Sequence, residues 1–274
     1  MLQIIHIAID GPSGAGKSTL AKNLAKSLGM LYVDTGALYR SIGYWVEQQG
    51  IDPADTQKVI ASLDTMQIEL CYRDGEQLVK VNGQNVSPYI RTGQVAAAAS
   101  IVSAIPKVRE FLLNTQRNIA KDRSCVMDGR DIGTKILPHA NVKIFLTADQ
   151  TDRAERRYQE LCKKGQKVDK ETVQSDIGKR DNTDTSRETA PLKMASDAVL
   201  LNNSGFTPQQ TLEAALKIWK PLYDFIPLLF KEPNPAPIKY CLERLSLIDS
   251  SEVRLPLTQI SNQLKEKLDC IIIK

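Results

Sequence analysis

Short apolar runs rich in β-branched residues recur along the whole chain. They lie at residues 4–9, 30–34, 124–128, 142–147 and 198–201. Runs of this length and composition are typical of strands that are buried on both faces of a parallel sheet. Because helix-favouring stretches separate them, the pattern predicts an α/β fold with a doubly wound parallel sheet and helices on both faces. In such sheets, ligands bind at the carboxyl ends of the strands.

Amphipathic stretches between these runs predict the helices. Residues 19–28 place apolar side chains at positions 20, 21, 24, 25 and 28, which form one helix face, and Gly29 follows as a stop signal. We expect further helices at residues 34–48, 54–63 and 90–121, with Pro106 opening a new helix inside the last of these.

Residues 67–90 have a different pattern. Apolar and polar side chains alternate there, and Asp74-Gly75 and Asn82-Gly83 separate the alternating runs. Dipeptides of this kind between β-rich runs are strong signals for hairpins. We therefore expect a small antiparallel β insert in a chain otherwise built of βα units. It is either an excursion without a role or a flap that helps to enclose a second substrate.

Residues 11–18 carry the motif Gly-Pro-Ser-Gly-Ala-Gly-Lys-Ser, between the first predicted strand and the first predicted helix. The spacing is that of a phosphate-binding loop (P-loop), in which glycines let backbone N–H groups converge on phosphate oxygens. The helix adds its positive N-terminal end. Lys17 is then placed to reach the outer phosphates, and the Ser18 hydroxyl to ligate Mg²⁺. The strand–loop–helix order favours a nucleoside triphosphate site over a glycine-rich turn without a ligand.

The composition is that of an ordinary globular protein, with 42% hydrophobic and 25% charged residues in 274 positions. That length suits one large α/β domain, or one domain with additions. A net charge of +4 is too small to indicate nucleic-acid binding by itself. Five cysteines are scattered, without a Cys-x-x-Cys pair, which indicates reduced thiols. There is no signal-peptide pattern and no apolar run near the roughly 20 residues that span a bilayer, so we expect a cytoplasmic protein without a membrane partner.

Charged residues follow the predicted strands where phosphates would bind. Asp128 ends a strand downstream of the phosphate loop, so it either acts on Mg²⁺ through a water molecule or stabilises a turn. Phosphoryl transfer needs charge neutralisation, and guanidinium groups suit phosphate oxygens. The arginines near predicted loops and helix ends are Arg40, Arg109, Arg130, Arg153, Arg156, Arg157, Arg180 and Arg187. Taken singly, each is more often a solvated surface charge.

Residues 150–168 combine three of these arginines with a lysine-rich turn. The segment is either a solvated helical hairpin or a mobile lid that closes over a triphosphate and excludes water. If it is a lid, we expect it to close before the phosphoryl group is transferred.

Together, these motifs resemble those of bacterial cytidylate kinases, which phosphorylate CMP and dCMP. The longest matching segments are residues 9–19, 34–40 and 128–134. Shorter ones are Ile90-Arg91-Thr92, Val108-Arg109-Glu110, Lys179-Arg180-Asp181 and Ala190-Pro191-Leu192, with Asp184 and Arg187 between the last two. The resemblance covers about residues 4–220 in the same order. It implies a cytidylate kinase domain at residues 1–220, with a lid at about 150–168 and a monophosphate-binding region extended by the insert at about 67–90.

The resemblance also implies ATP as co-substrate, Mg²⁺, and CMP or dCMP as the phosphate acceptor. ATP would be held by the phosphate loop and the residue after it, namely Gly11, Pro12, Ser13, Gly14, Ala15, Gly16, Lys17, Ser18 and Thr19. The lid residues that would meet its phosphates are Arg153, Arg156 and Arg157. Mg²⁺ would be held by Ser18 and Asp128.

On the acceptor side, the resemblance suggests that the cytosine edge is contacted by Ser100, Arg109 and Asp131. A carboxylate there accepts a hydrogen bond from the exocyclic amine of cytosine, whereas uracil offers only an acceptor. Because an unpaired buried polar group costs about 1–3 kcal/mol, this contact would favour CMP over UMP. The monophosphate would be held by Arg40, Arg130 and Arg187, and the ribose by Arg180 and Asp184. Thr35 stands where the family commonly has serine, so the hydroxyl is kept.

We expect in-line attack by a CMP phosphate oxygen on the γ-phosphorus of ATP, without a covalent intermediate or a dedicated general base. Mg²⁺ and cationic side chains would stabilise the charge on the transferring phosphoryl group. The residues expected to carry catalysis are Lys17, Arg130, Arg153, Arg157 and Arg187.

The resemblance ends near residue 220, and residues 221–274 form a C-terminal extension. The prolines that predict a stiff, extended connection at its start are Pro227, Pro233, Pro235 and Pro237. Beyond them, residues 238–242 and 255–274 are apolar enough for a strand or an amphipathic helix. The extension is either a tail packed on the core or an interaction module, and we expect a monomer.

Another small-molecule P-loop kinase, such as one that acts on UMP or on a metabolite alcohol, is the nearest alternative function. A GTP-driven switch would need an Asn-Lys-x-Asp guanine signature, which the sequence lacks. A nucleotide-binding protein without catalytic activity is a third reading, but it leaves the arginines unexplained.

Overall fold

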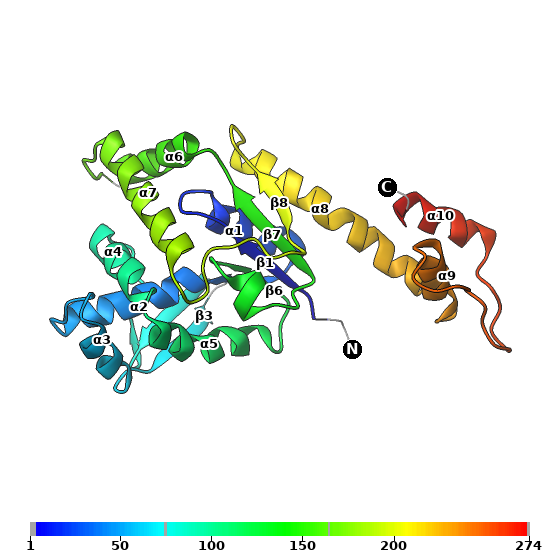
Figure 1. The fold of residues 1–274 in the computed structure, drawn as a ribbon, viewed down its shortest axis with the longest axis horizontal. Coiled ribbons are helices and arrows are strands. Elements are labelled where there is room, and N and C mark those ends of the chain that lie inside the picture. Colours follow the sequence, from blue (N-terminus) through cyan, green and yellow to red (C-terminus); the bar gives the residue numbers. More distant parts are fainter. Residues whose placement is uncertain (1–3, 74–75, 164, 273–274) are drawn as a thin grey trace. The chain divides into compact units, whose positions relative to one another are not determined.

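Five parallel strands form the main sheet in a computed structural model that describes residues 4–73, 76–163 and 165–272 (Figure 1). For residues 219–224 only the backbone is described. The strands, in sheet order, are β2 (Leu31–Asp34), β6 (Cys125–Asp128), β1 (His6–Asp10), β7 (Val142–Thr147) and β8 (Val199–Asn202). Neighbouring strands are parallel, and helices lie against both faces of the sheet. The predicted doubly wound parallel sheet is therefore confirmed.

The strand order places the first strand of the chain in the middle of the sheet. β1 pairs with β6 on one side and with β7 on the other, and both come much later in the sequence. Because all the strands run the same way, their carboxyl ends meet at one edge. Asp10, Asp34 and Asp128 are the last residues of β1, β2 and β6, so three acidic side chains start from that edge.

Local sequence signals set the ends of the helices. The helices of the first half are α1 (Lys17–Leu28), α2 (Thr35–Gln48), α3 (Thr56–Leu63), α4 (Gly93–Val102) and α5 (Pro106–Ala120). Gly29, in the left-handed conformation at φ 64°, ends α1. The side chains of Asp34, Asp55 and Thr92 accept backbone N–H groups and so cap α2, α3 and α4. Along the described part of the chain, no helix is both long and apolar enough to cross a membrane.

Close packing of α2 on α4 depends on Gly43. A Cβ atom at this position would lie 2.8 Å from the backbone nitrogen of Ala99 and 3.2 Å from the carbonyl oxygen of Val95. The core around this contact joins α2, α4, α5 and the insert, and it includes Leu38, Ile42, Val46, Val79, Val102 and Leu112. The missing side chain at position 43 therefore sets how closely α4 approaches α2.

The predicted antiparallel insert is confirmed, with β3 (Ile68–Arg73), β4 (Glu76–Val81) and β5 (Gln84–Asn85) forming a second sheet. Asn82 and Gly83 join β4 to β5 with φ angles of 48° and 79°, the positive values that a type I′ hairpin turn requires. The turn predicted at Asp74-Gly75 lies outside the described residues.

Two helices, α6 (Gln150–Lys163) and α7 (Lys170–Ser186), form a pair around a small apolar cluster of their own. The cluster contains Ala154, Val173 and Ile177. Asp169 caps α7 by accepting the N–H of Thr172 at 2.9 Å. Most of the segment 150–168 is α6, and its closure as a lid stays a prediction.

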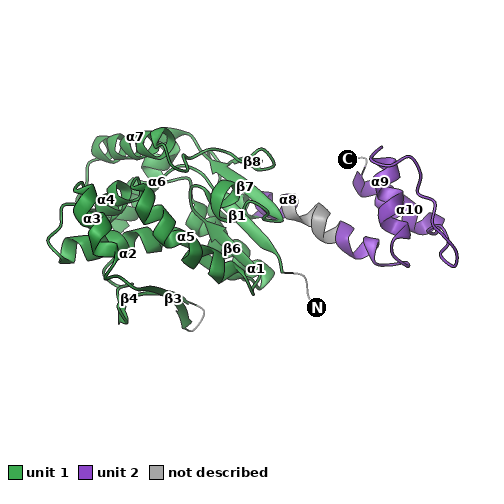
Figure 2. Cartoon of the chain, turned by 60° about the horizontal axis from the view of Figure 1, so that its bottom comes forward, with its two compact units in different colours: residues 1–212 green, residues 213–274 purple. Residues whose placement is uncertain are grey.

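The chain divides into two compact units, residues 1–212 and 213–274 (Figure 2). The second unit holds the C-terminal part of α8 (Pro208–Leu229) together with α9 (Ala236–Arg244) and α10 (Asn262–Ile272). Its core contains Ala236, Cys241, Ile260, Leu264 and Leu268. Tyr240 and Arg244 of α9 both donate hydrogen bonds to the Asp269 carboxylate of α10. Of the two apolar segments predicted to form a strand or a helix, residues 238–242 lie in α9, and residues 262–272 of the segment 255–274 form α10. α8 runs through residue 220, the predicted end of the kinase domain.

The extended connection predicted from the prolines is wrong. Pro227 lies near the end of α8, Pro235 is the N-cap residue of α9, and Pro237 lies in the first turn of α9. Proline lacks an N–H, but the N–H groups in the first turn of a helix have no partner within the helix, so proline is tolerated there. Pro235 and Pro237 therefore mark the start of a helix and not a stiff spacer.

Asp10 connects the central strand to the segment that follows β6. Its carboxylate accepts the backbone N–H groups of Ile132 and Gly133, both at 2.8 Å, where the short helix η1 (Ile132–Ile136) begins. Asp10 is buried, and burial raises the pKa of its carboxyl to about 6. One buried carboxylate thus joins the base of the phosphate loop to the segment that carries Arg130 and Asp131.

Gly43→Ala should destabilise the protein by about 1–3 kcal/mol, because the new Cβ atom must push α4 away from α2. Urea unfolding followed by circular dichroism measures the loss. Gly93→Ala is the matched control, since a Cβ at Gly93 would meet nothing within 4 Å. The control should change the free energy of unfolding by no more than about 0.5 kcal/mol. Equal stability of the two variants would contradict the tight contact.

Asp10→Asn should change how stability depends on pH. The carboxyl has a pKa of about 6 in the folded protein and 3.8 as its ordinary value, so the folded state keeps this proton to higher pH. The protonated carboxyl of Asp10 therefore stabilises the folded state fully below about pH 4. This contribution to the free energy of unfolding falls by up to about 3 kcal/mol as the pH rises to about 6. The amide does not titrate, so the stability of wild type minus that of the variant should decline across this window in urea unfolding series. Parallel pH curves would show that Asp10 is not the group responsible.

Candidate active site

The phosphate loop follows β1 and leads directly into α1. Gly14 and Gly16 adopt positive φ angles of 75° and 89°, which bend the backbone into a curl. A Cβ atom on Gly11 would lie 2.0 Å from the carbonyl oxygen of Leu146 in β7, so only glycine lets the chain leave the sheet here. The loop thus has the glycine-dependent shape in which backbone N–H groups form a cradle for an anion.

Lys17, the first residue of α1, is buried at the end of this loop. Its Nζ donates a hydrogen bond to the carbonyl oxygen of Pro12 at 2.7 Å. Burial, and then the nearby charge of Arg130, lower the pKa of Lys17 to about 7. Its charged form is therefore disfavoured in the free protein, and an anion in the cradle would favour it again.

Ser18 and Asp128 lie side by side at the edge of the sheet. Ser18 Oγ donates a hydrogen bond to Asp128 Oδ2 at 2.8 Å, and Tyr32 Oη donates to Oδ1 at 3.0 Å. Burial, and then the neighbouring Asp34, raise the pKa of Asp128 to about 6. The hydroxyl of Thr35 donates to the main-chain carbonyl oxygen of Asp128 at 2.7 Å, so Thr35 braces the same residue.

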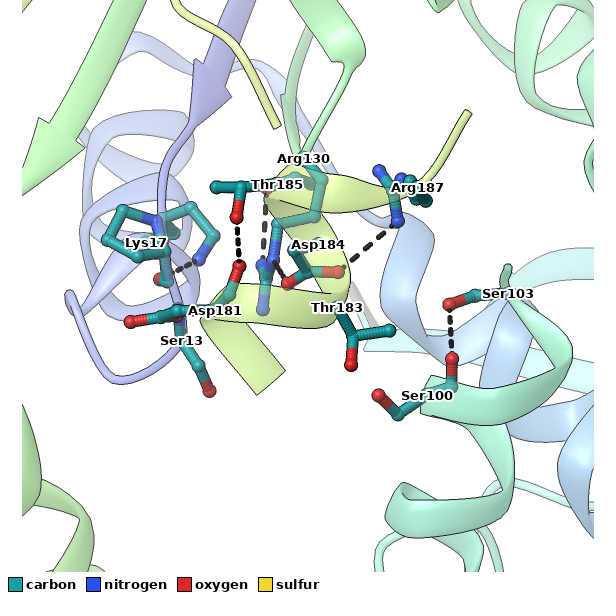
Figure 3. A network of polar contacts seen from close by, with 12 residues as sticks. Ser13, Lys17, Ser100, Ser103, Arg130, Asp181, Thr183, Asp184, Thr185 and Arg187 are labelled. Atoms are coloured by element: carbon teal, nitrogen blue, oxygen red, sulfur yellow. Dashed lines mark hydrogen bonds and ion pairs between the residues drawn. The ribbon is translucent and has the colours of Figure 1, made fainter. Parts of the chain in front are cut away.

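Asp184 of α7 holds two arginines beside the phosphate loop (Figure 3). Arg130 Nε donates to its Oδ2 at 2.6 Å, and Arg187 Nη1 donates to its Oδ1 at 3.2 Å. Burial would raise the pKa of Asp184, but the charges of Arg130 and Arg187 hold it below its ordinary value. The same Arg130 charge acts on Lys17, so the arginine cluster and the phosphate loop are electrostatic neighbours.

Two guanidinium nitrogens in this region are buried without a hydrogen-bond partner among the described residues. They are Arg40 Nε and Arg187 Nη2. Other nitrogens of the same groups are engaged, since Arg40 Nη2 donates to Asp34 at 2.8 Å and Arg187 Nε donates to the Ala190 carbonyl oxygen at 2.7 Å. A buried donor without an acceptor is costly and rare, so these two atoms indicate a site for an anion that supplies the missing oxygens.

Arg109 and Asp131 form a buried ion pair near this cluster. Arg109 Nη2 lies 2.5 Å from Asp131 Oδ2, and its Nη1 donates to the carbonyl oxygen of Ser103 at 3.1 Å. The guanidinium group also lies over the ring of Tyr39, 5.3 Å from its centroid. The hydroxyl of Ser103 in turn donates to the carbonyl oxygen of Ser100 (Figure 3). A chain of hydrogen bonds therefore joins the three residues predicted for the cytosine edge.

Arg153 reaches from α6 to the phosphate loop. Its Nη1 donates to the carbonyl oxygen of Ser13 at 2.8 Å and to Asp181 Oδ2 at 2.6 Å. Asp181 Oδ1 accepts the N–H of Ser13 at 3.1 Å. An ion pair between α6 and α7 thus holds both the backbone N–H and the carbonyl oxygen of Ser13, which places this lid arginine against the loop.

The other two arginines of α6, Arg156 and Arg157, have different partners. Arg156 donates to the side-chain oxygen and the carbonyl oxygen of Asn203, at 3.1 and 2.6 Å, in the loop after β8. Arg157 pairs with Glu160 on the same helix at 2.9 Å. Burial, followed by the charge of Arg157, lowers the pKa of Arg180 on α7, so these two arginines lie near each other. Contacts of Arg153, Arg156 and Arg157 with ATP stay predictions.

Three residues that sequence reasoning did not assign a role organise this site. Asn203 is buried and donates from Nδ2 to the carbonyl oxygen of Ala15 at 3.1 Å, so it braces the phosphate loop. Asp181 holds Ser13, and Tyr32 holds Asp128. Asp181 lies in one of the matching motifs and Tyr32 in a predicted strand, but no spacing rule gives either a role. No sequence signal points to Asn203.

Most of the chain matches one protein family. The model of the cytidylate kinase family matches residues 7–221. The cytidylate kinase of Caldicellulosiruptor bescii is 45% identical over 215 residues, which cover 78% of this chain and 95% of that protein. The cytidylate kinase of Lactiplantibacillus plantarum is 43% identical over 216 residues, which cover 79% of this chain and 95% of that protein.

Two further likenesses were found, one to a solved structure and one to a second family model. A solved shikimate kinase from Bacteroides thetaiotaomicron covers 80% of this chain and 99% of its own, at 13% identity and a TM-score of 0.40. Residues 207–274 match the model of the dihydrodipicolinate synthetase family, a different family from the one that matches the rest of the chain.

The match to the cytidylate kinase family covers most of the chain. It includes both the phosphate loop and the arginine cluster, and it continues beyond Asn203 into α8. The relatives are matched over nearly their whole length, so the likeness is not limited to a common loop motif. The chain belongs to the cytidylate kinase family.

Proposed function

We propose that this chain transfers the γ-phosphoryl group of ATP to CMP or dCMP, giving CDP or dCDP and ADP. The family assignment supports this reaction. At the site, the proposal rests on two buried guanidinium nitrogens, Arg40 Nε and Arg187 Nη2, which have no hydrogen-bond partner within the described part of the chain. A phosphate loop accounts for one bound anion, and these donors account for a second.

In this mechanism, the phosphate loop and Lys17 hold the phosphates of ATP, while Arg40, Arg130 and Arg187 hold the phosphate of the acceptor. Lys17 and Arg130 are close enough to interact electrostatically, so both can act on one transferring group. An acceptor phosphate oxygen attacks the γ-phosphorus in line, and the bond from that phosphorus to the bridging oxygen of ADP breaks. No general base is needed, because the monophosphate dianion is already a nucleophile. Arg153 and Arg157 add positive charge from the lid.

We propose that selectivity for the nucleobase is determined by Ser100, Arg109 and Asp131. Asp131 and Arg109 are both buried, so water does not compete for their remaining hydrogen-bonding capacity. The carboxylate accepts from the exocyclic amine of cytosine, and uracil has an acceptor at that position. Leaving a buried acceptor unpaired costs about 1–3 kcal/mol, which favours CMP over UMP by roughly 5- to 150-fold.

Other predicted acceptor contacts are already engaged within the protein. Both carboxylate oxygens of Asp184 accept from arginines, and the hydroxyl of Thr35 donates to Asp128. Each of these oxygens has a further lone pair that a ligand hydroxyl can use. We therefore keep Arg180 and Asp184 for the ribose, and Thr35 for the acceptor site, as proposals.

Magnesium fits the residues at the phosphate loop. Within the described residues, no group of three or more acidic, cysteine or histidine side chains is placed to hold a metal ion. A kinase does not need one, because Mg²⁺ there is held by one or two protein oxygens together with substrate phosphates and water. Ser18 and Asp128, whose oxygens lie 2.8 Å apart, are the residues we propose for it. When bound, the ion neutralises negative charge on the phosphates.

We further propose that the protein is a cytoplasmic monomer and acts without nucleic-acid or membrane partners. All five cysteines are free thiols, as is usual for proteins of a reducing compartment. The net charge of +4 gives no strong field for a polyanion.

A panel of acceptors tests the reaction. With ATP and Mg²⁺, the purified protein should release ADP rapidly when CMP or dCMP is added, and far more slowly with UMP, AMP or shikimate. A coupled assay measures ADP release, and chromatography identifies CDP as the product. Failure to make CDP would overturn the proposal, and faster turnover of UMP would replace it with a UMP kinase.

Lys17→Ala should abolish turnover while leaving the fold largely intact, because it removes the cation that neutralises the outer phosphates of ATP. We expect kcat to fall by at least about 100-fold. Lys26→Ala, on the exposed face of α1, is the matched control and should keep the wild-type kcat. Thermal unfolding checks that both variants are folded. A near-normal kcat in Lys17→Ala would defeat the assignment of the loop.

A further inference from the structure

β2 lies at one end of the main sheet, and one side of its backbone has no strand beside it among the described strands. The N–H of Leu31 donates to Ser124 at 3.1 Å, just before β6, so Leu31 and Val33 direct their backbone groups toward β6. Backbone groups alternate in direction along a strand, so those of Tyr32 and Asp34 point to the open side. An open strand edge is a row of unpaired donors and acceptors.

Two side chains of the insert fill this edge. Gln77 of β4 accepts the N–H of Asp34 at 2.8 Å and donates from Nε2 to the carbonyl oxygen of Asp34 at 3.0 Å. Tyr72 of β3 donates its hydroxyl to the carbonyl oxygen of Tyr32 at 3.1 Å. Tyr72 and Gln77 lie directly opposite each other in the β3–β4 register, so a single cross-strand pair makes all three bonds.

Asp34 links this contact to Arg40 of the proposed acceptor site. Its Oδ1 accepts the N–H of Ala37, which caps α2, and its Oδ2 accepts from Arg40 Nη2 at 2.8 Å. Space is tight, because a Cβ atom on Gly36 would lie 3.0 Å from Arg40 Nη1 and 3.2 Å from Asp34 Oδ1. The position of the Asp34 backbone therefore sets the direction of Arg40, whose Nε has no partner among the residues that the structure describes.

We propose that Gln77 and Tyr72 are positioning residues for the acceptor phosphate and act through Asp34 and Arg40. The side-chain amide of Gln77 holds the backbone of Asp34 as a neighbouring strand would, by one donated and one accepted hydrogen bond. The insert thereby sets the geometry of a phosphate-binding arginine. The inference rests on the proposed role of Arg40 in binding the acceptor.

Gln77→Met tests the role of the amide, because methionine has a similar volume but cannot make either hydrogen bond. The KM for CMP should rise roughly tenfold, while the KM for ATP stays within about twofold of wild type. Tyr72→Phe removes a single hydrogen bond and should raise the KM for CMP roughly two- to threefold. Gln84→Met, on the exposed strand β5 of the same sheet, is the matched control and should keep both KM values.

A double-mutant cycle shows whether the effect passes through Arg40. In an Arg40→Ala background, Gln77→Met should change the KM for CMP by less than about twofold, because the group it positions is already absent. An undiminished effect in that background would overturn the inference. So would an unchanged KM for CMP in both Gln77→Met and Tyr72→Phe, or a KM for ATP that rises in parallel.

The two proposals can fail separately. If the wild-type protein does not phosphorylate CMP, the proposed function fails. If it does so and the folded variants match it, only the role of Gln77 and Tyr72 fails. Thermal unfolding identifies folded variants, and Tyr72→Phe, the smaller change, carries the test should Gln77→Met lose its fold.

Discussion

Positive charge buried at one edge of a parallel sheet is the constraint on which the arrangement of this protein depends. Moving a charged group out of water costs several kcal/mol per ion unless a partner compensates it. Aspartates supply part of that compensation: Asp34 holds Arg40, Asp131 holds Arg109, and Asp184 holds Arg130 and Arg187. Among the described residues they leave Arg40 Nε and Arg187 Nη2 without an acceptor, and a bound anion would supply one.

Much of the fold can be predicted from the sequence because neighbouring residues determine it. The apolar run at 142–147 forms β7 at the same residues, and the Asp34 cap sits where a strand gives way to a helix. Prolines are ambiguous by comparison, since their fixed φ suits an extended chain and the first turn of a helix equally. Local sequence therefore does not decide between the two at Pro235 and Pro237, which begin α9 in the structure.

The candidate site likewise contains residues that local sequence reveals and residues that only the packing reveals. Residues inside a contiguous motif, such as Lys17 in the phosphate loop, can be found from spacing alone. Bonds that join distant segments cannot, and these include Asn203 to Ala15 and Gln77 to Asp34. Each depends on how two elements pack, and no periodicity encodes that. The ligand contacts inferred from the family resemblance stay predictions for a different reason, since each depends on a bound nucleotide.

The central strand of the sheet is the first to be synthesised, and its partners arrive late. β1 ends at Asp10, whereas β6 and β7 occupy residues 125–128 and 142–147, and Asn203 braces the loop at Ala15 from still further along the chain. A nascent polypeptide therefore carries the glycine loop before the neighbours that shape it have been synthesised. Glycines on their own do not favour one conformation, so these later neighbours help to fix the shape of the loop. A product truncated before residue 203 lacks Asn203, and with it the hydrogen bond to Ala15 that braces the loop.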